Sequence, residues 1–176
     1  MSSSGGTRAA ISSVQYGTAT ILDTATSATA TITAVDTTRS TVLILGAYQG
    51  ANLGNVTETH YRARVVLTNA TTVTASRQGS AYILTVAFVV ITWVAPKSVQ
   101  VGTFTIAALA SSGTATITGV DTTRAALFFA GYTIGTNTES AFPDNVGMVL
   151  TNATTITATR FGTGDAITIG YAVVEF

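Results

Sequence analysis

Histidine and cysteine, the residues that most often build catalytic and metal sites, are nearly absent from this chain. Its 176 residues include one histidine, His60, and no cysteine. A histidine-centred triad would have to be built around that one side chain, and a lone histidine beside a loop is usually an ordinary polar surface residue. The sequence therefore predicts no nucleophilic site and no bound metal.

The acidic residues are too scattered to act as a catalytic pair. Glycosidase chemistry needs two neighbouring carboxyl groups, and phosphate binding needs a glycine-rich turn between a strand and a helix. The sequence contains neither pattern; its acids are Asp23, Asp36, Glu58, Asp121, Glu139, Asp144, Asp165 and Glu175. We expect a protein that is not an enzyme and uses no cofactor, and a hydrolase is the disfavoured alternative.

The chain has two similar halves, and several of its few charged residues recur in both. An aspartate and an arginine recur together at two similar turns, and a further arginine recurs at the end of two similar strands. Such retention could reflect a shared ligand site, but pairing with a local aspartate or with a neighbouring subunit is the commoner use of an arginine. We interpret all six as structural turn and charge pairs: Asp36, Arg39, Asp121, Arg124, Arg77 and Arg160.

The two halves differ most at residues 49–64 and 133–147, where recognition of a ligand would be expected. Long loops on a rigid β scaffold commonly carry binding, and amide and aromatic side chains suit sugar hydroxyls. Simple drift in an exposed loop is the alternative. The candidate ligand or partner residues are Gln49, Asn52, Asn55, His60, Tyr61, Asn137, Phe142 and Asp144.

The similarity between the halves is an internal duplication. The segment from Ser13 to Thr18 returns nearly unchanged from Ser98 to Thr103. The segment from Val66 to Thr72 returns from Val149 to Thr155, at a slightly shorter spacing, so the second copy has lost two residues in between. A repeat of this length is large enough to fold around a small core of its own.

We place the domain boundary at the hinge Ala95-Pro96-Lys97. Residues 1–11 are small and polar, have no counterpart before the second copy, and are expected to form a flexible N-terminal arm. Residues 12–94 then form the first repeat, residues 95–97 the linker and residues 98–176 the second repeat. Separate cores and one shared core are both open at this point.

Composition and alternation predict an all-β fold. Thr, Val, Ile, Tyr and Phe are plentiful, whereas the helix formers Leu, Glu and Lys are scarce. The strands expected in the first copy are 14–22, 28–35, 41–48, 61–67, 71–77 and 82–93, and the last is apolar on both phases, which is typical of a central strand. We predict two tandem, internally duplicated small antiparallel β-sandwich domains of about six strands each.

Two kinds of turn residue recur in both copies. Asp36 and Asp121 are expected to close tight turns, because an aspartate side chain can accept a hydrogen bond from the amide two residues on. Asn69 and Asn152 are expected to make short hairpins, since asparagine tolerates left-handed backbone geometry. We interpret these residues as structural.

The chain carries unusually little charge. Charged residues make up 9% of the sequence, hydrophobic residues 47%, and the formal net charge is zero. An ordinary soluble domain is about 25% charged, and a neutral surface is prone to association. We interpret large parts of the exterior as interfaces; the alternative is that threonine hydroxyls alone keep the chain soluble.

The same composition argues against several partners and locations. Neutral charge disfavours nucleic acid and anionic membranes as ligands. The longest apolar run, residues 86–94, is too short to span a bilayer, and residues 1–8 lack the apolar core of a secretion signal. We expect a protein made in a cytoplasm that does not insert into membranes.

Several segments resemble small threonine-rich β-sandwich proteins of tailed-bacteriophage virions, a group that includes capsid decoration proteins, head fibres and tail-fibre domains. They run from Val35 to Arg39, from Val65 to Arg77 and from Tyr171 to Phe176. The six-strand order with a terminal Trp93 is also similar to H-type lectin domains, which are trimeric sugar binders. In the second copy Phe176 stands where that tryptophan would be.

The resemblance implies a bacteriophage virion structural protein, a capsid decoration or head-fibre protein that binds the capsid surface. It would be made in the bacterial host cytoplasm and located in the virion. The partners so implied are further copies of the chain, as a homotrimer, and other virion proteins such as the major capsid protein. The alternative is a receptor-binding tail-fibre protein or lectin-like adhesin that recognises host surface glycan.

Overall fold

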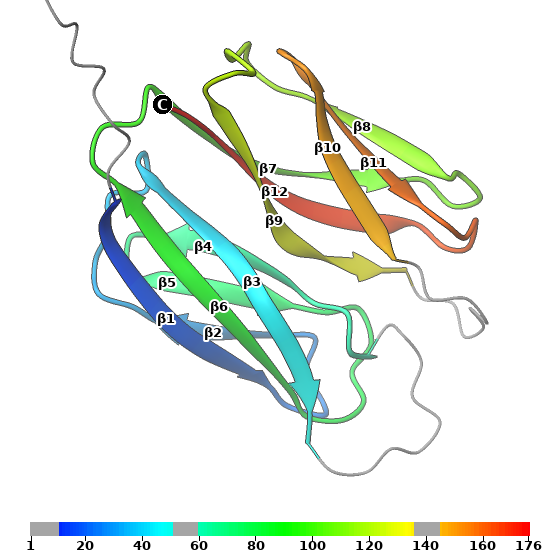
Figure 1. The fold of residues 1–176 in the computed structure, drawn as a ribbon. Coiled ribbons are helices and arrows are strands. Elements are labelled where there is room, and N and C mark those ends of the chain that lie inside the picture. Colours follow the sequence, from blue (N-terminus) through cyan, green and yellow to red (C-terminus); the bar gives the residue numbers. More distant parts are fainter. Residues whose placement is uncertain (1–10, 51–59, 136–144) are drawn as a thin grey trace, which may run out of the picture.

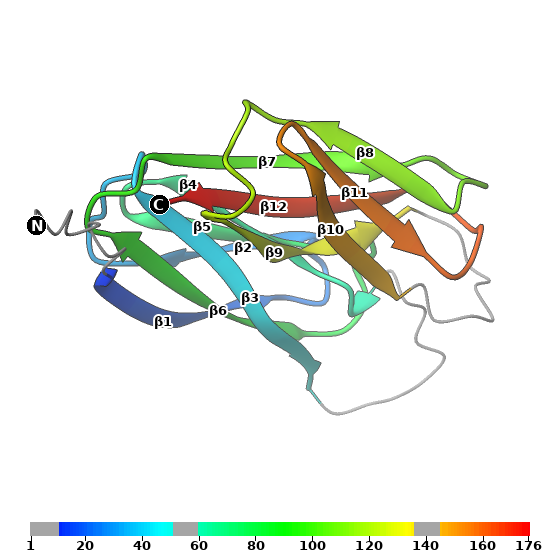
Figure 2. The same cartoon turned by 45° about the horizontal axis from the view of Figure 1, so that its top comes forward.

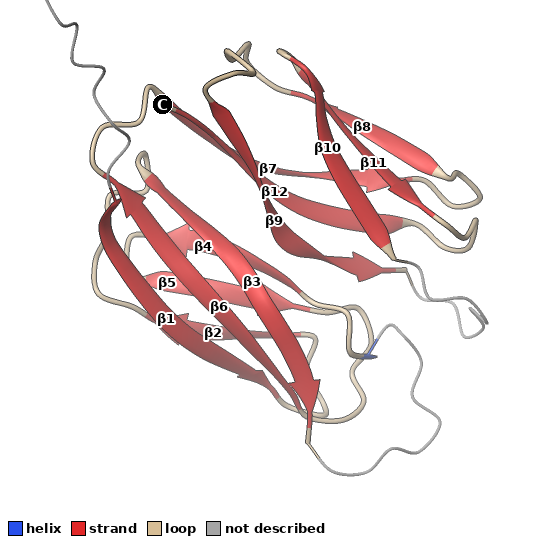
Figure 3. Cartoon of the chain, viewed as in Figure 1, coloured by secondary structure: helices blue, strands red, loops and turns tan. Residues whose placement is uncertain are grey.

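Strands joined by turns make up the described part of the chain, which in this computed structural model is residues 11–50, 60–135 and 145–176 (Figure 3). The strands are β1 (Ile11–Ile21), β2 (Ser27–Thr31), β3 (Ser40–Gln49), β4 (Arg64–Asn69), β5 (Thr72–Ser76), β6 (Leu84–Trp93), β7 (Ser98–Ile106), β8 (Ser112–Thr116), β9 (Ala125–Ile134), β10 (Val146–Asn152), β11 (Thr155–Arg160) and β12 (Ile167–Glu175). The predicted all-β class is confirmed.

Each repeat is a sandwich of two antiparallel layers (Figure 1). In the first repeat the order β1-β6-β3 forms one layer, and β2, β5 and β4 form the other. In the second repeat β7, β12 and β9 form one layer, and the order β10-β11-β8 forms the other. The layers match strand for strand, as expected of an internal duplication.

The apolar final strand of each copy lies in the middle of its layer, as its pattern predicts. The strand β6 pairs with β1 on one side and β3 on the other, and β12 pairs likewise with β7 and β9. Strands with one apolar face behave differently: in β5, Val73 and Ala75 are fully buried while Thr72 and Thr74 are partly exposed. Pattern and position in the sheet therefore agree.

Four predicted strands are longer than the observed ones, and two of them differ by three or more residues at one end. The strand expected over 28–35 ends at Thr31. The amides of Ile32 and Val35 instead donate to the carbonyls of Thr71 and Ala70 in the β4–β5 turn, at 2.9 Å each. The strand expected over 61–67 begins only at Arg64.

Each repeat has a hydrophobic core of its own. Phe88, Leu84 and Ile21 are the largest buried side chains of the first, and Ile106, Ile156 and Ile169 are among the largest of the second. Ala130 is the exception, because it belongs to the second repeat by sequence but packs in the first core, at 5% exposure. The cores are separate and touch at one point.

That point lies where two layers join edge to edge into one six-stranded sheet, β2-β5-β4-β9-β12-β7 (Figure 2). Arg64 of β4 pairs with Gly131 of β9, and the Tyr132 amide donates to the Ala63 carbonyl at 3.1 Å. Gly131 has a φ of 89°, and a Cβ there would lie 2.2 Å from the Ala63 oxygen. Only glycine allows this approach of the two backbones.

Trp93 holds the repeats together near the hinge. Its ring centroid lies 5.8 Å from that of Phe128 and 5.2 Å from that of Phe176, and its Nε1–H donates to the Thr41 hydroxyl at 3.4 Å. Phe176 is the counterpart of Trp93 in the second copy. The aromatic residues that end the two repeats therefore pack against each other.

The start of the first repeat lies slightly earlier than expected. The sequence places Ile11 in the N-terminal arm, but in the structure it already belongs to β1 and pairs with Trp93. The rest of the arm, residues 1–10, lies outside the described residues.

Candidate functional site

Arg77 and Arg160 are buried structural residues. Arg77 is 3% exposed and donates to the carbonyls of Leu22 at 2.7 Å, Ala81 at 2.8 Å, His60 at 3.1 Å and Ala25 at 3.1 Å. Burial lowers the pKa of its guanidinium. The expected carboxylate partner is thus replaced by backbone oxygens, because this arginine ends a strand where several loops converge.

Arg160 repeats this arrangement in the second copy. It donates to the carbonyls of Ala110 at 2.8 Å, Gly164 at 3.0 Å and Ala107 at 3.1 Å, and also to that of Asp165. Backbone carbonyls are therefore acceptors for this guanidinium as well. Both arginines hold loops within their own repeat.

The Asp36 turn has the local bonds that its sequence suggests. Asp36 accepts hydrogen bonds from the Thr38 amide at 3.0 Å and from the Thr38 hydroxyl at 2.6 Å, and it pairs with Arg39 at 2.9 Å. Bonds from Thr38 and Arg39 hold the pKa of Asp36 below its ordinary value. This cluster stabilises a turn and is exposed on the surface.

The equivalent turn in the second copy has different charged partners. Asp121 accepts from the Thr123 amide and hydroxyl, at 2.9 and 2.7 Å, and these bonds lower its pKa. An ion pair lies beside this turn: Lys97 donates to the Glu175 carboxylate at 2.7 Å, and the Asp121 amide donates to the same carboxylate at 3.0 Å. Glu175 replaces Thr92 of the first copy, which bonds a hydroxyl instead.

The expected hairpin asparagines act through their side chains. Asn69 accepts from the Thr71 amide, and Asn152 from the Thr154 amide, at 2.9 Å each. Neither has a positive φ, so the expected left-handed geometry is wrong. The side-chain bond alone closes each turn.

Three of the candidate recognition residues can be placed. Gln49 ends β3, and its Nε2 is buried without a hydrogen-bond partner among the described residues. His60 packs edge-on against Tyr82, with ring centroids 5.9 Å apart, and burial followed by the charge of Arg77 lowers its pKa. Tyr61 lies under the guanidinium of Arg62, 5.1 Å away. The other candidates, Asn52, Asn55, Asn137, Phe142 and Asp144, lie outside the described residues.

A hollow of about 590 Å³ lies at the same end of the first repeat as His60 and Gln49. It is lined by Asp23, Thr24, Gly50, Ser80, Ala81, Tyr82 and Ile83. One carboxylate, two hydroxyl side chains and a tyrosine ring offer hydrogen bonds and a stacking surface. The hollow suits a polar ligand, and among the described residues its lining holds one carboxylate, that of Asp23.

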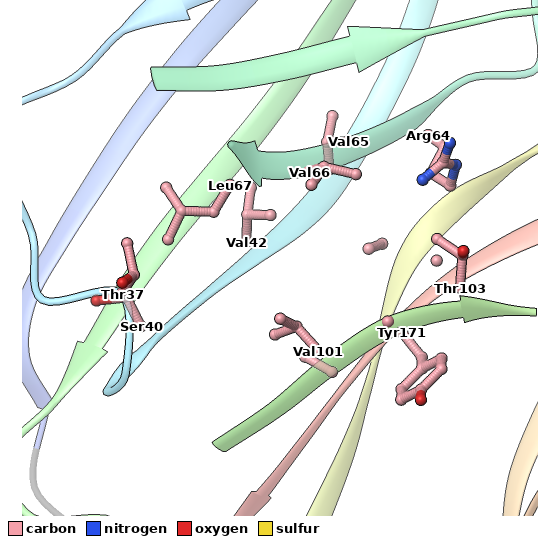
Figure 4. Close-up of a pocket in the computed structure, with 14 residues that line it drawn as sticks. Thr37, Ser40, Val42, Arg64, Val65, Val66, Leu67, Val101, Thr103 and Tyr171 are labelled. Carbon is pink, nitrogen blue, oxygen red and sulfur yellow. The ribbon is translucent and has the colours of Figure 1, made fainter. Parts of the chain in front are cut away.

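The second candidate site is a cleft of about 270 Å³ between the repeats (Figure 4). Valines such as Val42 and Val66 on one side and Val101 on the other make its walls mainly apolar. The full lining is Thr37, Ser40, Val42, Arg64, Val65, Val66, Leu67, Val101, Gly102, Thr103, Ala130, Gly170, Tyr171 and Ala172. The cleft therefore lies between the β3–β4 side of the first sandwich and the second repeat.

Arg64 and its neighbour Arg62 supply the charge near this cleft. Burial lowers the pKa of Arg64, whose Nε has no hydrogen-bond partner among the described residues. The Arg62 guanidinium lies 5.1 Å from the Tyr61 ring and 5.2 Å from the Tyr132 ring, so it bridges the two repeats by cation–π contacts. These residues strengthen a junction and contribute no acid–base pair.

The described residues offer binding surfaces and no evident reaction centre. They contain no cluster of three or more His, Asp or Glu side chains able to hold a metal ion. No helix in the described part of the chain is long and apolar enough to cross a membrane.

Sequence reasoning missed the junction residues. Arg64 and Tyr171 carry no motif. Gly131 recurs in the first copy as Gly46, and this repetition was the signal in the sequence that could have identified it. A repeated glycine does not indicate which strand lies against it.

Comparison with known proteins adds no relative. No protein-family model matches the chain, and no match is found among curated proteins or solved structures.

Proposed function

We propose that this chain is a non-enzymatic structural protein of a bacteriophage virion, a capsid decoration or head-fibre protein. It would bind the capsid surface and sister subunits through its exterior. The observation that carries the proposal is an exterior rich in apolar side chains and poor in charge. Thirteen large hydrophobic residues are exposed in the described part of the chain: Ile11, Val14, Tyr16, Leu22, Leu45, Tyr48, Val66, Ile83, Val94, Val101, Leu109, Val149 and Phe161.

These side chains occur on both repeats, and few charges separate them. Only 9% of the sequence is charged. Contact with another neutral surface then requires little desolvation of charge, and each apolar group removed from water adds favourable free energy. Charge is likewise depleted at the centres of stable protein interfaces. The surface therefore suits broad contacts with sister subunits and with a capsid, and a homotrimer is the assembly we propose.

The test is the association of the full chain with particles. Particles from the source of this sequence would be banded on a density gradient, and their proteins quantified by mass spectrometry. We expect the chain to band with the particle in fixed stoichiometry to the major capsid protein, including after a wash in high salt, because the contacts carry little charge. A chain found only in the soluble fraction contradicts the proposal.

The alternative, an adhesin that binds host glycan, is favoured by the 590 Å³ hollow beside Tyr82 and Asp23. Binding sites combine aromatic side chains with a few polar groups, and hydroxyl and carboxylate groups can form hydrogen bonds with sugar hydroxyls. Titration of the isotopically labelled chain with a panel of oligosaccharides would distinguish the two functions. Shifts confined to the amides around this hollow support the adhesin, and unchanged spectra count against it.

A further inference from the structure

The strand pairing between the two repeats uses one edge of each, and the matching edges make no such pairing among the described residues. In the first repeat the β4 edge pairs, at Arg64, with the bulge of β9. The counterpart of β9 in the first repeat is β3, and the counterpart of β4 in the second repeat is β10. Both are edge strands of their layers, and neither pairs with a strand beyond its own layer among the described residues.

A bulge occurs at equivalent positions in both copies. The β3–β6 register shifts between Ile44 and Gly46, and the matching shift in β12–β9 leaves Ala130 and Gly131 without partners in β12. In the alignment of the repeats that matches Ser13 with Ser98, Leu45 corresponds to Ala130 and Gly46 to Gly131. The first repeat thus has a register shift at the position that the second repeat uses to dock, although Gly46 has an ordinary φ and Gly131 a positive one.

In the first repeat this bulge is left uncovered by the described residues. Ala130 is buried in a neighbouring core, whereas Leu45 is 57% exposed. A Cβ added to Gly46 would meet no atom within 4 Å, and Gly46 has an ordinary φ. The isolated chain therefore does not require glycine at position 46, and it leaves a leucine in solvent. Both features fit a docking element that another chain covers.

The matching receptor lies on the open side of the second sandwich. In the first repeat this side is closed, and Val65 is 1% exposed. Its counterpart Met148 is only partly buried, as is Leu127, the counterpart of the buried Val42, and Val149 is 59% exposed. Val149 corresponds to Val66, which lines the cleft between the repeats. Among the described residues, the second core thus has less cover on this side than the first.

We propose that a second copy of this chain supplies that cover, head to tail, with Leu45 of one copy inserted against the open β9–β10 side of the next. The β10 edge then pairs with the β3 bulge as β4 pairs with β9. This deepens the proposed function, on which it rests, by naming the contact through which copies assemble.

Backbone groups match as well as side chains. Within the chain, the Tyr132 amide donates across the junction to the Ala63 carbonyl. Ala47 lies opposite Val86 in the same register as Tyr132 opposite Ile169, so its amide points off the free edge of β3. The counterpart of Ala63 in the second repeat is Val146, whose carbonyl in the next copy is therefore the acceptor. The contact carries both a strand-pairing bond and a buried leucine.

Such a contact joins different surfaces of the two copies and is heterologous. A heterologous contact closes into a ring when its rotation divides a full turn, and otherwise continues as a filament. Three copies would place six similar repeats in one ring, which is the homotrimer proposed above.

The test uses one variant for each side of the contact. Leu45→Asp places a charge on the inserted residue, and Val149→Asp places one on the receptor; both side chains are exposed in the single chain, so folding should be preserved. Leu109→Asp, at an 80% exposed leucine away from both surfaces, is the matched control. Mass would be measured by analytical ultracentrifugation over a range of concentrations, and circular dichroism would check the fold.

We expect the wild type and Leu109→Asp to exceed the 18.0 kDa chain mass, and each of the other variants alone to stay at it. Mixing Leu45→Asp with Val149→Asp should restore one intact contact and give a dimer that grows no further. Wild-type association that survives both substitutions overturns this interface but leaves the assembly role standing. A wild type that stays a single chain at every concentration overturns the contact, and particle binding then decides the proposed function separately.

Discussion

At the scale of single residues, the buried arginines are the strongest polar anchors of the fold. Replacing Arg77 with methionine keeps much of its volume but leaves the carbonyls of Leu22, Ala81 and His60 without their donor. Hydrogen bonds to charged groups contribute about 1.5–3 kcal/mol each and unsatisfied buried groups cost similar amounts, so we expect Arg77→Met to lower the free energy of unfolding by about 3 kcal/mol or more.

Urea denaturation followed by circular dichroism measures this loss. Arg124→Met is the control, since this exposed arginine should change stability by less than about 0.5 kcal/mol. Equal effects of the two substitutions would refute the anchoring role of Arg77.

Glu175 makes stability depend on acidity. The bond from Lys97, then the bond from the Asp121 amide, holds the pKa of this carboxyl below its ordinary value. A carboxyl with a lowered pKa in the folded state stabilises the fold above its ordinary pKa, and the contribution is lost as the pH falls through the folded value. We therefore expect the urea midpoint to fall on acidification, and to fall less steeply in Glu175→Gln. Identical acid profiles in both proteins would contradict this.

Some of these residue roles were predictable and others were not. The Asp36 turn follows from sequence, because its acceptor and the amide it binds are two residues apart. The partners of Arg77 do not, because they are backbone carbonyls from distant loops and carry no signature of their own. The ion pair of Glu175 with Lys97 was missed for a related reason: it joins residues 78 positions apart and exists in one repeat only.

At the scale of secondary-structure elements, two glycine–aromatic pairs hold edge strands to central strands. Gly17 of β1 lies opposite Phe88, and Gly102 of β7 lies opposite Tyr171, which are equivalent positions in the two copies. A Cβ at Gly17 would lie 2.5 Å from the Phe88 ring, and one at Gly102 would lie 2.7 Å from the Tyr171 hydroxyl. Each ring therefore covers the space that its glycine leaves empty.

Gly17→Val should push the Phe88 ring out of its place and lower the free energy of unfolding by about 1–3 kcal/mol, the usual effect of overpacking a core. Gly147→Ala is the control, because a Cβ there meets only Thr159 at an ordinary 3.8 Å. Thermal unfolding of both variants checks the expectation, and a Gly17→Val protein as stable as the wild type would refute it.

The strands themselves were largely predictable because apolar alternation and turn residues are local signals. All six strands expected in the first copy exist, and the apolar last strand is central. The bulge at Leu45 and Gly46 was not predictable, since an extra residue in one strand is defined only by the strand it pairs with. The end of β2 at Thr31 was missed because the following amides bond a turn that lies far along the chain.

At the scale of the whole molecule, an aromatic cluster couples two sandwiches that have separate cores. Trp93→Ala removes the contacts with Phe128 and Phe176, and truncation of a buried aromatic residue costs about 3–5 kcal/mol. Because the loss falls on the junction, we expect calorimetry to show two transitions in place of one. Phe161→Ala, at an 84% exposed ring, is the control. A single transition shared by both repeats of Trp93→Ala would contradict this coupling role.

Duplication was visible in the sequence, and the way in which the copies meet was not. Repeated strings identify equivalent residues. Whether the repeats have one shared core or two depends on which strand edges pair, and Gly131 and Ala130 make that contact only in the folded chain. The same equivalence, once the junction is known, identifies the β3 and β10 edges as its unused counterparts.

The central claim is that these two edges are covered by sister chains, and hydrogen–deuterium exchange tests it most directly. Exchange in peptides spanning Ser40–Gln49 and Val146–Asn152 would be compared between the wild type and Leu45→Asp at equal, high concentration. We predict slower exchange in both peptides of the wild type, with the other strands unchanged. Equal exchange in the two proteins would show that the edges stay open to water and would contradict the account.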